Sequence, residues 1–178
     1  GVVLELGGND IGIVLGDVDV DAVAPRIFGS AFLNMGQTCA ALKRLYVHES
    51  VYDQLTQKLA EIADAQVVGD GLDATTTFGP IQNRMQYNKV KSLIDDAVAQ
   101  GGEIITQQGE FTASGYYVRP TLVTHVQAGV ALVDEEQFGP VLPIVKFSHI
   151  DEAITAANST CFGLGGSVWS KDIEQAQQ

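Results

Sequence analysis

The sequence is poor in the residues that would build a disulfide-rich, metal-binding or nucleic-acid-binding protein. Its two cysteines, Cys39 and Cys161, lack the spacing of a zinc site and cannot form a disulfide framework, so we expect no metal and a reducing compartment, the cytoplasm. Basic residues are scarce, because 10 Lys and Arg stand against 22 Asp and Glu, which gives a formal net charge of −12. An acidic surface repels phosphate backbones, which argues against nucleic-acid binding.

Long apolar runs are also missing. No stretch approaches the roughly 20 apolar residues of a membrane-spanning helix, and no secretory signal pattern opens the chain. Apolar residues still make up 46% of the 178 residues, which is typical of a folded domain with a sizeable core. The sequence starts in a strand-like segment and stops in a helix-like one, so we expect it to be cut from a longer polypeptide at both ends.

Strand-like and helix-like segments alternate along the chain. Asp19 or Asp21 suits the start of the first helix, and Pro25 fits its first turn, where a missing N–H costs little. The alternation predicts one α/β domain over residues 1–178, with three layers (α/β/α) and a mostly parallel sheet. Strands are expected at 2–6 (buried), 11–15, 45–48, 103–106, 116–119, 122–126, 141–147 and 166–169, and helices from Asp19 or Asp21 to about Asn34 and at 51–65, 83–100, 151–158 and 171–178.

Cys39 is the residue that bears most directly on function. It ends the run NMGQTC at residues 34–39, between a helix-like and a strand-like segment, where a turn can expose the thiol. A thiolate is the strongest side-chain nucleophile near neutral pH. Backbone N–H groups of the turn, including that of Cys39, could stabilise an oxyanion. The alternative is a buried structural cysteine, which is a common state of a free thiol, and Cys161 is interpreted in that way.

Glu5 lies in the apolar segment LELGG at residues 4–8. Burial of a carboxylate is costly, so this position indicates either the exposed side of an edge strand or a general base inside a site. A carboxylate near a thiol can activate the water that releases an acyl group from sulfur. Together, Glu5 and Cys39 predict covalent catalysis through a thioester.

A third polar segment is DEEQFGP at residues 134–140. Adjacent carboxylates usually form a solvated turn, and composition alone favours that interpretation. A carboxylate can also bind both hydroxyls of a ribose, and a neighbouring aromatic ring can pack on a nicotinamide. By contrast, GLGG at residues 163–166 fits neither phosphate-binding pattern, and the scattered residues His48, His125 and His149 predict no metal site.

Taken in order, these segments resemble the aldehyde dehydrogenase superfamily. LELGG at 4–8 is similar to its glutamate signature, GQTC at 36–39 to its cysteine signature, and DEEQFGPV at 134–141 to its cofactor-contacting segment. GYYVRPT at 115–121 and ANST at 157–160 match further family stretches. The resemblance covers the whole chain and implies a fold like the family's catalytic domain, without the amino-terminal cofactor domain and the carboxyl-terminal arm.

The resemblance implies an oxidation of an aldehyde to a carboxylic acid. Cys39 would attack the aldehyde carbonyl to give a thiohemiacetal, and hydride would pass to NAD or NADP to leave a thioacyl enzyme. Glu5 would activate the water that releases the acid, and its presence favours water over coenzyme A as the acyl acceptor. With most of the cofactor site outside the chain, we expect little or no dehydrogenase activity from this segment alone.

The resemblance also assigns cofactor contacts and partners. Glu136 would bind the nicotinamide ribose and Phe138 would lie near the nicotinamide, with Gly7 and Gly8 as backbone positions beside the cofactor. Asn9 departs from the family, in which many members carry Lys at this point. The implied partners are an aldehyde substrate and a second copy of the chain, most simply in a homodimer, with no nucleic acid and no membrane. The alternative is a catalytically silent structural or oligomerisation module.

Overall fold

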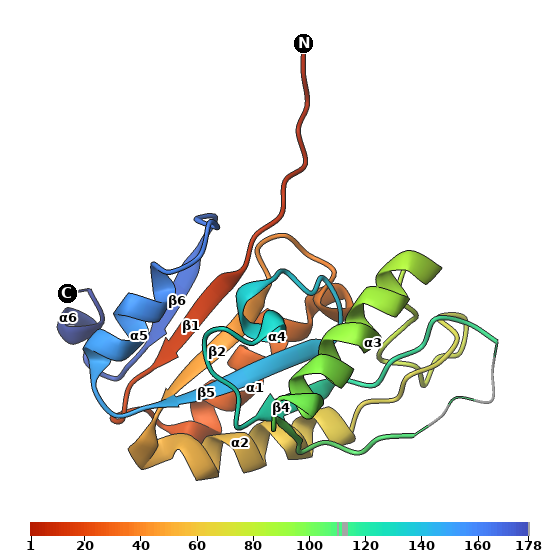
Figure 1. Ribbon diagram of the computed structural model, residues 1–178. Helices are drawn as coiled ribbons and strands as arrows, with labels where there is room; N and C mark the ends of the chain where they lie inside the picture. The colour runs from red at the N-terminus through yellow and green to blue at the C-terminus, as the bar shows by residue number, and fades with distance from the viewer. Residues whose placement is uncertain (110, 112–113, 178) are drawn as a thin grey trace.

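The computed structural model describes residues 1–109, 111 and 114–177. The strands of these residues are β1 (Asp10–Val14), β2 (Leu42–His48), β3 (Glu103–Ile104), β4 (Thr121–Thr124), β5 (Val141–Phe147) and β6 (Gly166–Trp169). They form one sheet in the order β3-β4-β5-β2-β1-β6 (Figure 1). Every neighbouring pair is parallel except β3 and β4, which are antiparallel. The predicted α/β class with a mostly parallel sheet is confirmed.

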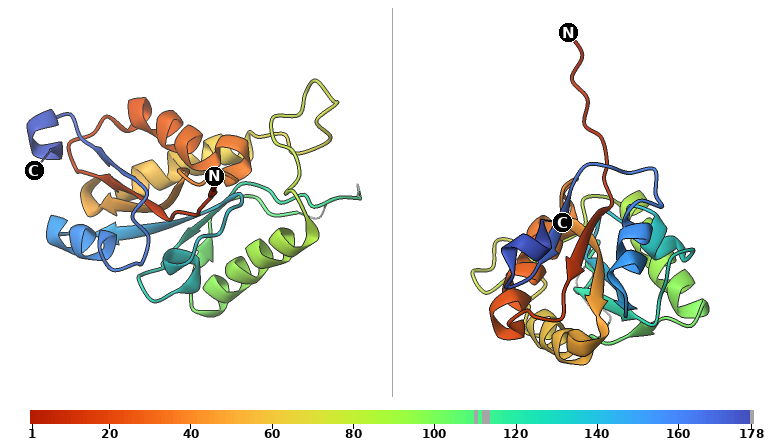
Figure 2. Two further views of the ribbon diagram at one scale, coloured as in Figure 1. Left: turned by 90° about the horizontal axis from the view of Figure 1, so that it is seen from above. Right: turned by 90° about the vertical axis from the view of Figure 1, so that its left-hand side faces the viewer.

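Helices cover both faces of the sheet. The helices of the described residues are α1 (Val20–Phe32), the 3-10 helix η1 (Leu33–Gly36), α2 (Glu49–Asp64), α3 (Arg84–Ala99), α4 (Ala131–Asp134), α5 (Ile150–Ala157) and α6 (Ile173–Ala176). Figure 2 shows α1 and α2 on one side of the sheet and α3, α4 and α5 on the other. Alternate residues of a strand point to opposite faces. Leu45 therefore enters the core under α1 and α2, and Tyr46 enters the core under α3.

The predicted buried strand at residues 2–6 is wrong. Residues 1–9 contain no strand. Residues 1–7 are exposed and run away from the body of the molecule, whereas Gly8 and Asn9 are buried just before β1 (Figure 1). Val3 is 91% exposed and Leu4 is 70% exposed. The segment has the apolar composition of a strand. A strand forms only where a neighbour pairs with its backbone groups, and no described strand pairs with this segment.

Of the two predicted N-caps of the first helix, Asp19 is the one found in the structure. Asp19 is the N-cap of α1, and its side-chain Oδ1 accepts a hydrogen bond from the backbone N–H of Ala22 at 3.3 Å. Asp21 lies inside the first turn. The placement of Pro25 is wrong, because Pro25 is the sixth residue of α1 and not part of its first turn. The helix accepts this proline on its exposed side.

Other strands also differ from the prediction. Residues 116–119 form no strand, although the carbonyl of Tyr116 accepts a hydrogen bond from the N–H of Ile81 at 2.9 Å. The strand predicted at 103–106 is shorter, and that predicted at 45–48 begins earlier, at Leu42. The early start of β2 was missed because Lys43 and Arg44 interrupt the apolar pattern, yet both are buried.

Candidate active site

Cys39 lies in the turn between η1 and β2, which follows a left-handed stretch of backbone. Asn34, Met35 and Gly36 have φ angles of 52°, 62° and 69°, a region that costs non-glycine residues about 1 kcal/mol or more. Glycine is required at position 36, because a Cβ there would meet the carbonyl oxygen of Gly139. Cys39 is half-buried and not sealed in the core.

Side-chain amides brace this turn. The Oε1 of Gln37 accepts a hydrogen bond from the N–H of Gln82 at 2.9 Å, which ties the turn to the segment before α3. The Nδ2 of Asn34 donates to the carbonyl of Gln37 at 3.1 Å, and the Nε2 of Gln37 donates to the carbonyl of Asn34 at 3.3 Å. Hydrogen bonds within the turn and to the segment before α3 therefore fix the backbone that leads to Cys39.

Gly7 and Gly8 pass between the Cys39 turn and Glu136. The N–H of Gly8 donates to Oε1 of Glu136 at 2.9 Å. A Cβ on Gly7 would meet the Glu136 carboxylate, and a Cβ on Gly8 would lie 2.7 Å from the carbonyl oxygen of Cys39. Only a backbone without side chains fits into this space. Three of the segments singled out in the sequence thus meet at one point.

Lys43 lies at the centre of this meeting point. Its side chain is buried, with 2% exposed, and its Nζ donates to the carbonyls of Thr38 and Cys39 at 2.5 and 2.9 Å. The same ammonium lies 3.8 Å from Oε1 of Glu136. Burial lowers the pKa of Lys43, whereas the carboxylates of Glu136 and Asp10 act in the opposite direction. One buried cation therefore contacts both the Cys39 turn and the Glu136 carboxylate.

The segment after Glu136 is anchored to β2. Gln137 is buried, and its Nε2 donates to the carbonyls of Lys43 and Val141 at 2.7 and 2.8 Å. The ring centroid of Phe138 lies 5.7 Å from Nζ of Lys43. Phe138 has a φ of 46°, a strained conformation that proteins often keep at functional positions. The bonds of Gln137 hold this strained residue beside the site.

Buried charges also fix the start of β1. The guanidinium of Arg44 donates to the carbonyls of Asn9, Ala156 and Ala157 at distances of 2.9, 2.9 and 3.1 Å. Asp10 accepts a hydrogen bond from the N–H of Gly165 at 3.1 Å, and burial raises the pKa of Asp10. The glycines at 163–166 thus close onto a carboxylate. A carboxylate at this position would repel a phosphate group.

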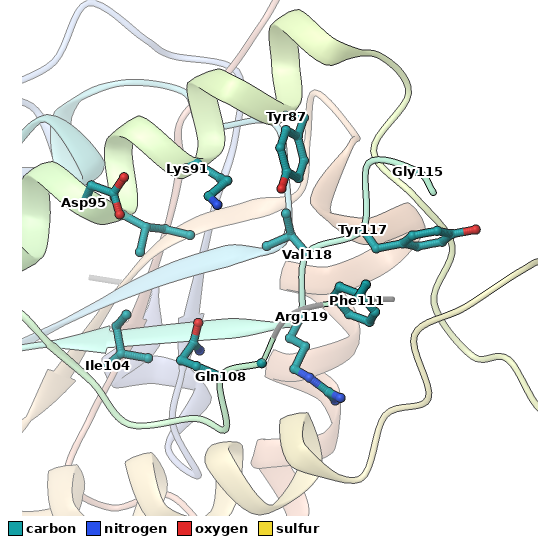
Figure 3. Close-up of a pocket in the computed structure, with 12 residues that line it drawn as sticks. Tyr87, Lys91, Asp95, Ile104, Gln108, Phe111, Gly115, Tyr117, Val118 and Arg119 are labelled. Carbon is teal, nitrogen blue, oxygen red and sulfur yellow. The ribbon is translucent and has the colours of Figure 1, made fainter. Parts of the chain in front are cut away.

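A separate cavity of about 420 Å³ lies between α3 and residues from 104–109, 111 and 115–119 (Figure 3). Tyr87, Lys91 and Asp95 face it from α3, and Tyr117 and Arg119 face it from the opposite wall. None of the predicted site residues lines this cavity. We therefore assign the candidate active site to the Cys39 turn and not to this hollow.

The described residues show neither a bilayer-spanning helix nor a cluster of metal ligands. No helix in this part of the chain has both the length and the apolar character that a bilayer span requires. In the same residues, no group of three or more His, Cys, Asp or Glu side chains is placed to hold a metal ion.

Comparison with known proteins decides the family. The chain matches the model of the aldehyde dehydrogenase family over residues 1–178. The chain belongs to the aldehyde dehydrogenase family. It is 44% identical to a probable aldehyde dehydrogenase of a Pseudomonas species over 160 residues, which cover 90% of this chain and 33% of that protein. It is 37% identical to a putative aldehyde dehydrogenase of Gibberella moniliformis, with 99% of this chain and 37% of that protein covered.

A solved structure agrees with this assignment. A mutant of an aldehyde dehydrogenase from Pseudomonas syringae, crystallised with NAD+ and octanal, superposes with a TM-score of 0.91 at 34% identity. The superposition covers 97% of this chain and 36% of that one. The chain therefore spans only about a third of the length of these aldehyde dehydrogenases, and it has the fold of the corresponding part.

In this aldehyde dehydrogenase segment, the structure brings most of the predicted site residues together but leaves one apart. Gly7, Gly8, Cys39 and Glu136 meet through the contacts described above, and Phe138 lies beside them. Glu5 does not join them: it lies in the exposed segment before β1, and among the described residues no hydrogen bond or ion pair links it to Cys39. Its role as general base stays a prediction.

The second thiol is more accessible than expected for a structural cysteine. Cys161 is exposed in the segment before β6, whereas Cys39 is half-buried. Exposure alone therefore does not distinguish Cys39, the predicted nucleophile, from Cys161. Any measurement of thiol chemistry on this chain requires Cys161 to be replaced first.

Sequence reasoning missed the buried polar residues that assemble the site. Lys43, Arg44 and Gln137 are each at most 3% exposed. Arg44 and Gln137 donate to backbone carbonyls from distant parts of the chain, and Lys43 pairs with the distant Glu136 while it donates to carbonyls of its own turn. A signal was available for the first two, because two adjacent cations precede the apolar residues of β2. Buried cations need partners, so this pair could have marked a polar centre under the strand.

Proposed function

We propose that this chain is the thiol-bearing catalytic part of an enzyme that oxidises an aldehyde to a carboxylic acid with NAD or NADP. The observation that carries the proposal is the contact of Gly8 with both Glu136 and the Cys39 turn, bridged by the buried Lys43. Family membership supplies the reaction class, and this geometry supplies the nucleophile and its surroundings.

The proposed chemistry begins at Cys39. The thiolate forms a C–S bond to the aldehyde carbon, and the carbonyl oxygen becomes an alkoxide that backbone N–H groups of the turn can stabilise. Among the described residues, the N–H of Cys39 has no hydrogen-bond acceptor, so it is available for this purpose. After the aldehyde hydrogen has left as hydride, water attacks the thioester, Glu5 takes the proton of that water, and the acid leaves as the thiolate is restored.

The residues present fit one end of a nicotinamide dinucleotide. Because Gly7 and Gly8 carry no side chain, the carboxylate of Glu136 approaches the backbone closely here, and the ring of Phe138 lies on the same buried Lys43. A carboxylate suits the hydroxyls of a ribose, and an aromatic ring suits a flat nicotinamide. When bound, the nicotinamide would accept the hydride. The described residues give no basis for a choice between NAD and NADP, and the homodimer expected from the family stays a prediction.

An acylation assay without cofactor tests the nucleophile independently of the oxidation step. p-Nitrophenyl acetate acylates a reactive thiol without a cofactor, and each acylation releases one p-nitrophenolate. In a Cys161→Ser background we expect a burst of about one equivalent per chain, followed by slow turnover. Cys39→Ala should abolish the burst, and Glu5→Gln should keep the burst but slow the later phase if Glu5 activates water.

The outcome also tests the silent-module alternative. An unchanged burst in Cys39→Ala would refute Cys39 as the nucleophile, and an absent burst in both proteins would favour the silent module. A parallel assay with NAD+, NADP+ and a short aldehyde should show little NADH or NADPH from this segment alone, since only one end of the cofactor site is present. Strong reduced-cofactor formation would overturn that expectation.

A further inference from the structure

We propose that Lys43 is a positioning residue that turns the backbone N–H groups of Cys39 and Ala40 toward the oxyanion of the acyl-transfer steps. The inference rests on the proposed function, which makes Cys39 the nucleophile. Lys43 itself contacts carbonyl oxygens and one carboxylate, so it acts through the turn and not on the substrate.

The argument starts from the number of donors on an ammonium group. Lys43 has three N–H donors and no acceptor. Its Nζ donates to three carbonyls of one short turn, those of Thr38, Cys39 and Ala41, at 2.5, 2.9 and 3.3 Å. The turn therefore wraps around the ammonium with its oxygens inward.

The geometry of the peptide unit gives the direction of the opposite groups. A trans peptide is planar, so its C=O and its N–H point in opposite directions, and the described residues contain no cis peptide. Because the carbonyl of Thr38 points at Lys43, the N–H of Cys39 points away from it. The carbonyl of Cys39 sets the N–H of Ala40 in the same way. Neither N–H has an acceptor within the described part of the chain.

The surroundings keep the ammonium in place. Lys43 is 2% exposed, and the groups that face it are Glu136 at 3.8 Å, the ring of Phe138 and, at longer range, Asp10 and the thiol of Cys39. A buried cation without partners is costly. The carboxylate of Glu136 and the turn carbonyls therefore stabilise the buried ammonium, and the ammonium in turn fixes the direction of these carbonyls. Two unpaired N–H groups beside a half-buried thiol match the donor arrangement that acyl transfer requires.

The test compares two reactions of the same thiol. Acylation by p-nitrophenyl acetate passes through an oxyanion, whereas alkylation by iodoacetamide is a displacement at carbon without one. In a Cys161→Ser background, Lys43→Met should slow acylation of Cys39 by about 10-fold or more, since loss of one oxyanion donor typically costs about 100-fold or more. Alkylation should change by less than about threefold, because this displacement needs no oxyanion donor.

A control variant and the remaining outcomes decide between the proposal and its alternatives. Lys58→Met removes the same charge from the exposed face of α2, where Lys58 pairs with Asp21 at 3.1 Å, and should alter neither rate. Equal changes in both rates for Lys43→Met would show that Lys43 acts on the thiol itself, and no change in either would show a purely structural role; both results overturn the proposal. If Lys43→Met does not fold, Lys43→Gln takes its place, because it keeps two donors without the charge. Lys43→Gln should slow acylation more than alkylation, although to a smaller extent. Equal changes in the two rates, or no change in either, would refute the proposal. A parent protein without any burst would contradict the proposed function and not the role of Lys43 alone.

Discussion

Replacement of Gly36 by alanine tests whether the left-handed turn before Cys39 depends on glycine. A Cβ at this position would meet the carbonyl oxygen and carbon of Gly139 and lie 3.2 Å from the carbonyl oxygen of Ala31. These are backbone atoms of two different elements, so no flexible side chain can move aside. At a φ of 69°, alanine costs about 1 kcal/mol, and overpacking adds about 2 kcal/mol.

The expected loss is therefore about 3 kcal/mol of unfolding free energy, or about 6–12 °C in melting temperature for a chain of this size. Circular dichroism during thermal and urea unfolding measures both quantities. Gly29→Ala is the matched control, because Gly29 is an exposed residue of α1 with no atom within 4 Å of its added Cβ. That substitution should stabilise the chain by about 0.5–1 kcal/mol. If both variants shift in the same direction, or if Gly36→Ala melts within about 1 °C of the parent protein, the steric argument is wrong.

Two further predictions concern capping and acid stability. Asp19→Ala should cost about 1 kcal/mol in urea unfolding because it removes the N-cap of α1. Asp21→Ala removes an exposed first-turn carboxylate and its surface ion pair with Lys58, which is worth little, and should cost less than Asp19→Ala. Equal losses would contradict the capping assignment. Asp17 accepts hydrogen bonds from the Ser170 hydroxyl and two backbone N–H groups, which outweigh desolvation and lower the pKa of Asp17 below its ordinary value of 3.8. Its ionised form therefore stabilises the fold above about pH 4, and that contribution is lost as the pH falls through the lowered pKa. Asp17→Asn should lower the melting temperature by a few degrees at pH 7 and by much less at pH 3, and a pH-independent difference would show that ionisation plays no part.

Periodicity and capping chemistry predicted most of the architecture. The strands at Val141–Phe147 and Gly166–Trp169 have the predicted bounds, and α3 begins after its Asn83 cap, one residue inside the predicted range. These elements carry strong local signals. The exposed segment at residues 2–6 carries a strand pattern of the same quality, yet it has no partner within the described chain. A local pattern records what a segment can form, whereas pairing depends on what lies beside it.

The site was predictable where a motif names a residue and unpredictable where a residue acts through tertiary contacts. Cys39, Glu136 and the glycine pair were found from their segments, and the structure brings them together. Lys43 and Gln137 were not found, because their partners lie on other elements and become neighbours only after the chain has folded. A charged residue in a short apolar strand is ambiguous until the groups around it are known.

The position of β1 has a consequence for biosynthesis. This strand lies between β2, which follows it closely along the chain, and β6, which ends at Trp169. While the ribosome is still making the intervening residues, one edge of β1 has no neighbour, and an unpaired edge is a template for aggregation. A nascent chain that stalls before β6 emerges would therefore depend on chaperones, however well its earlier helices have formed.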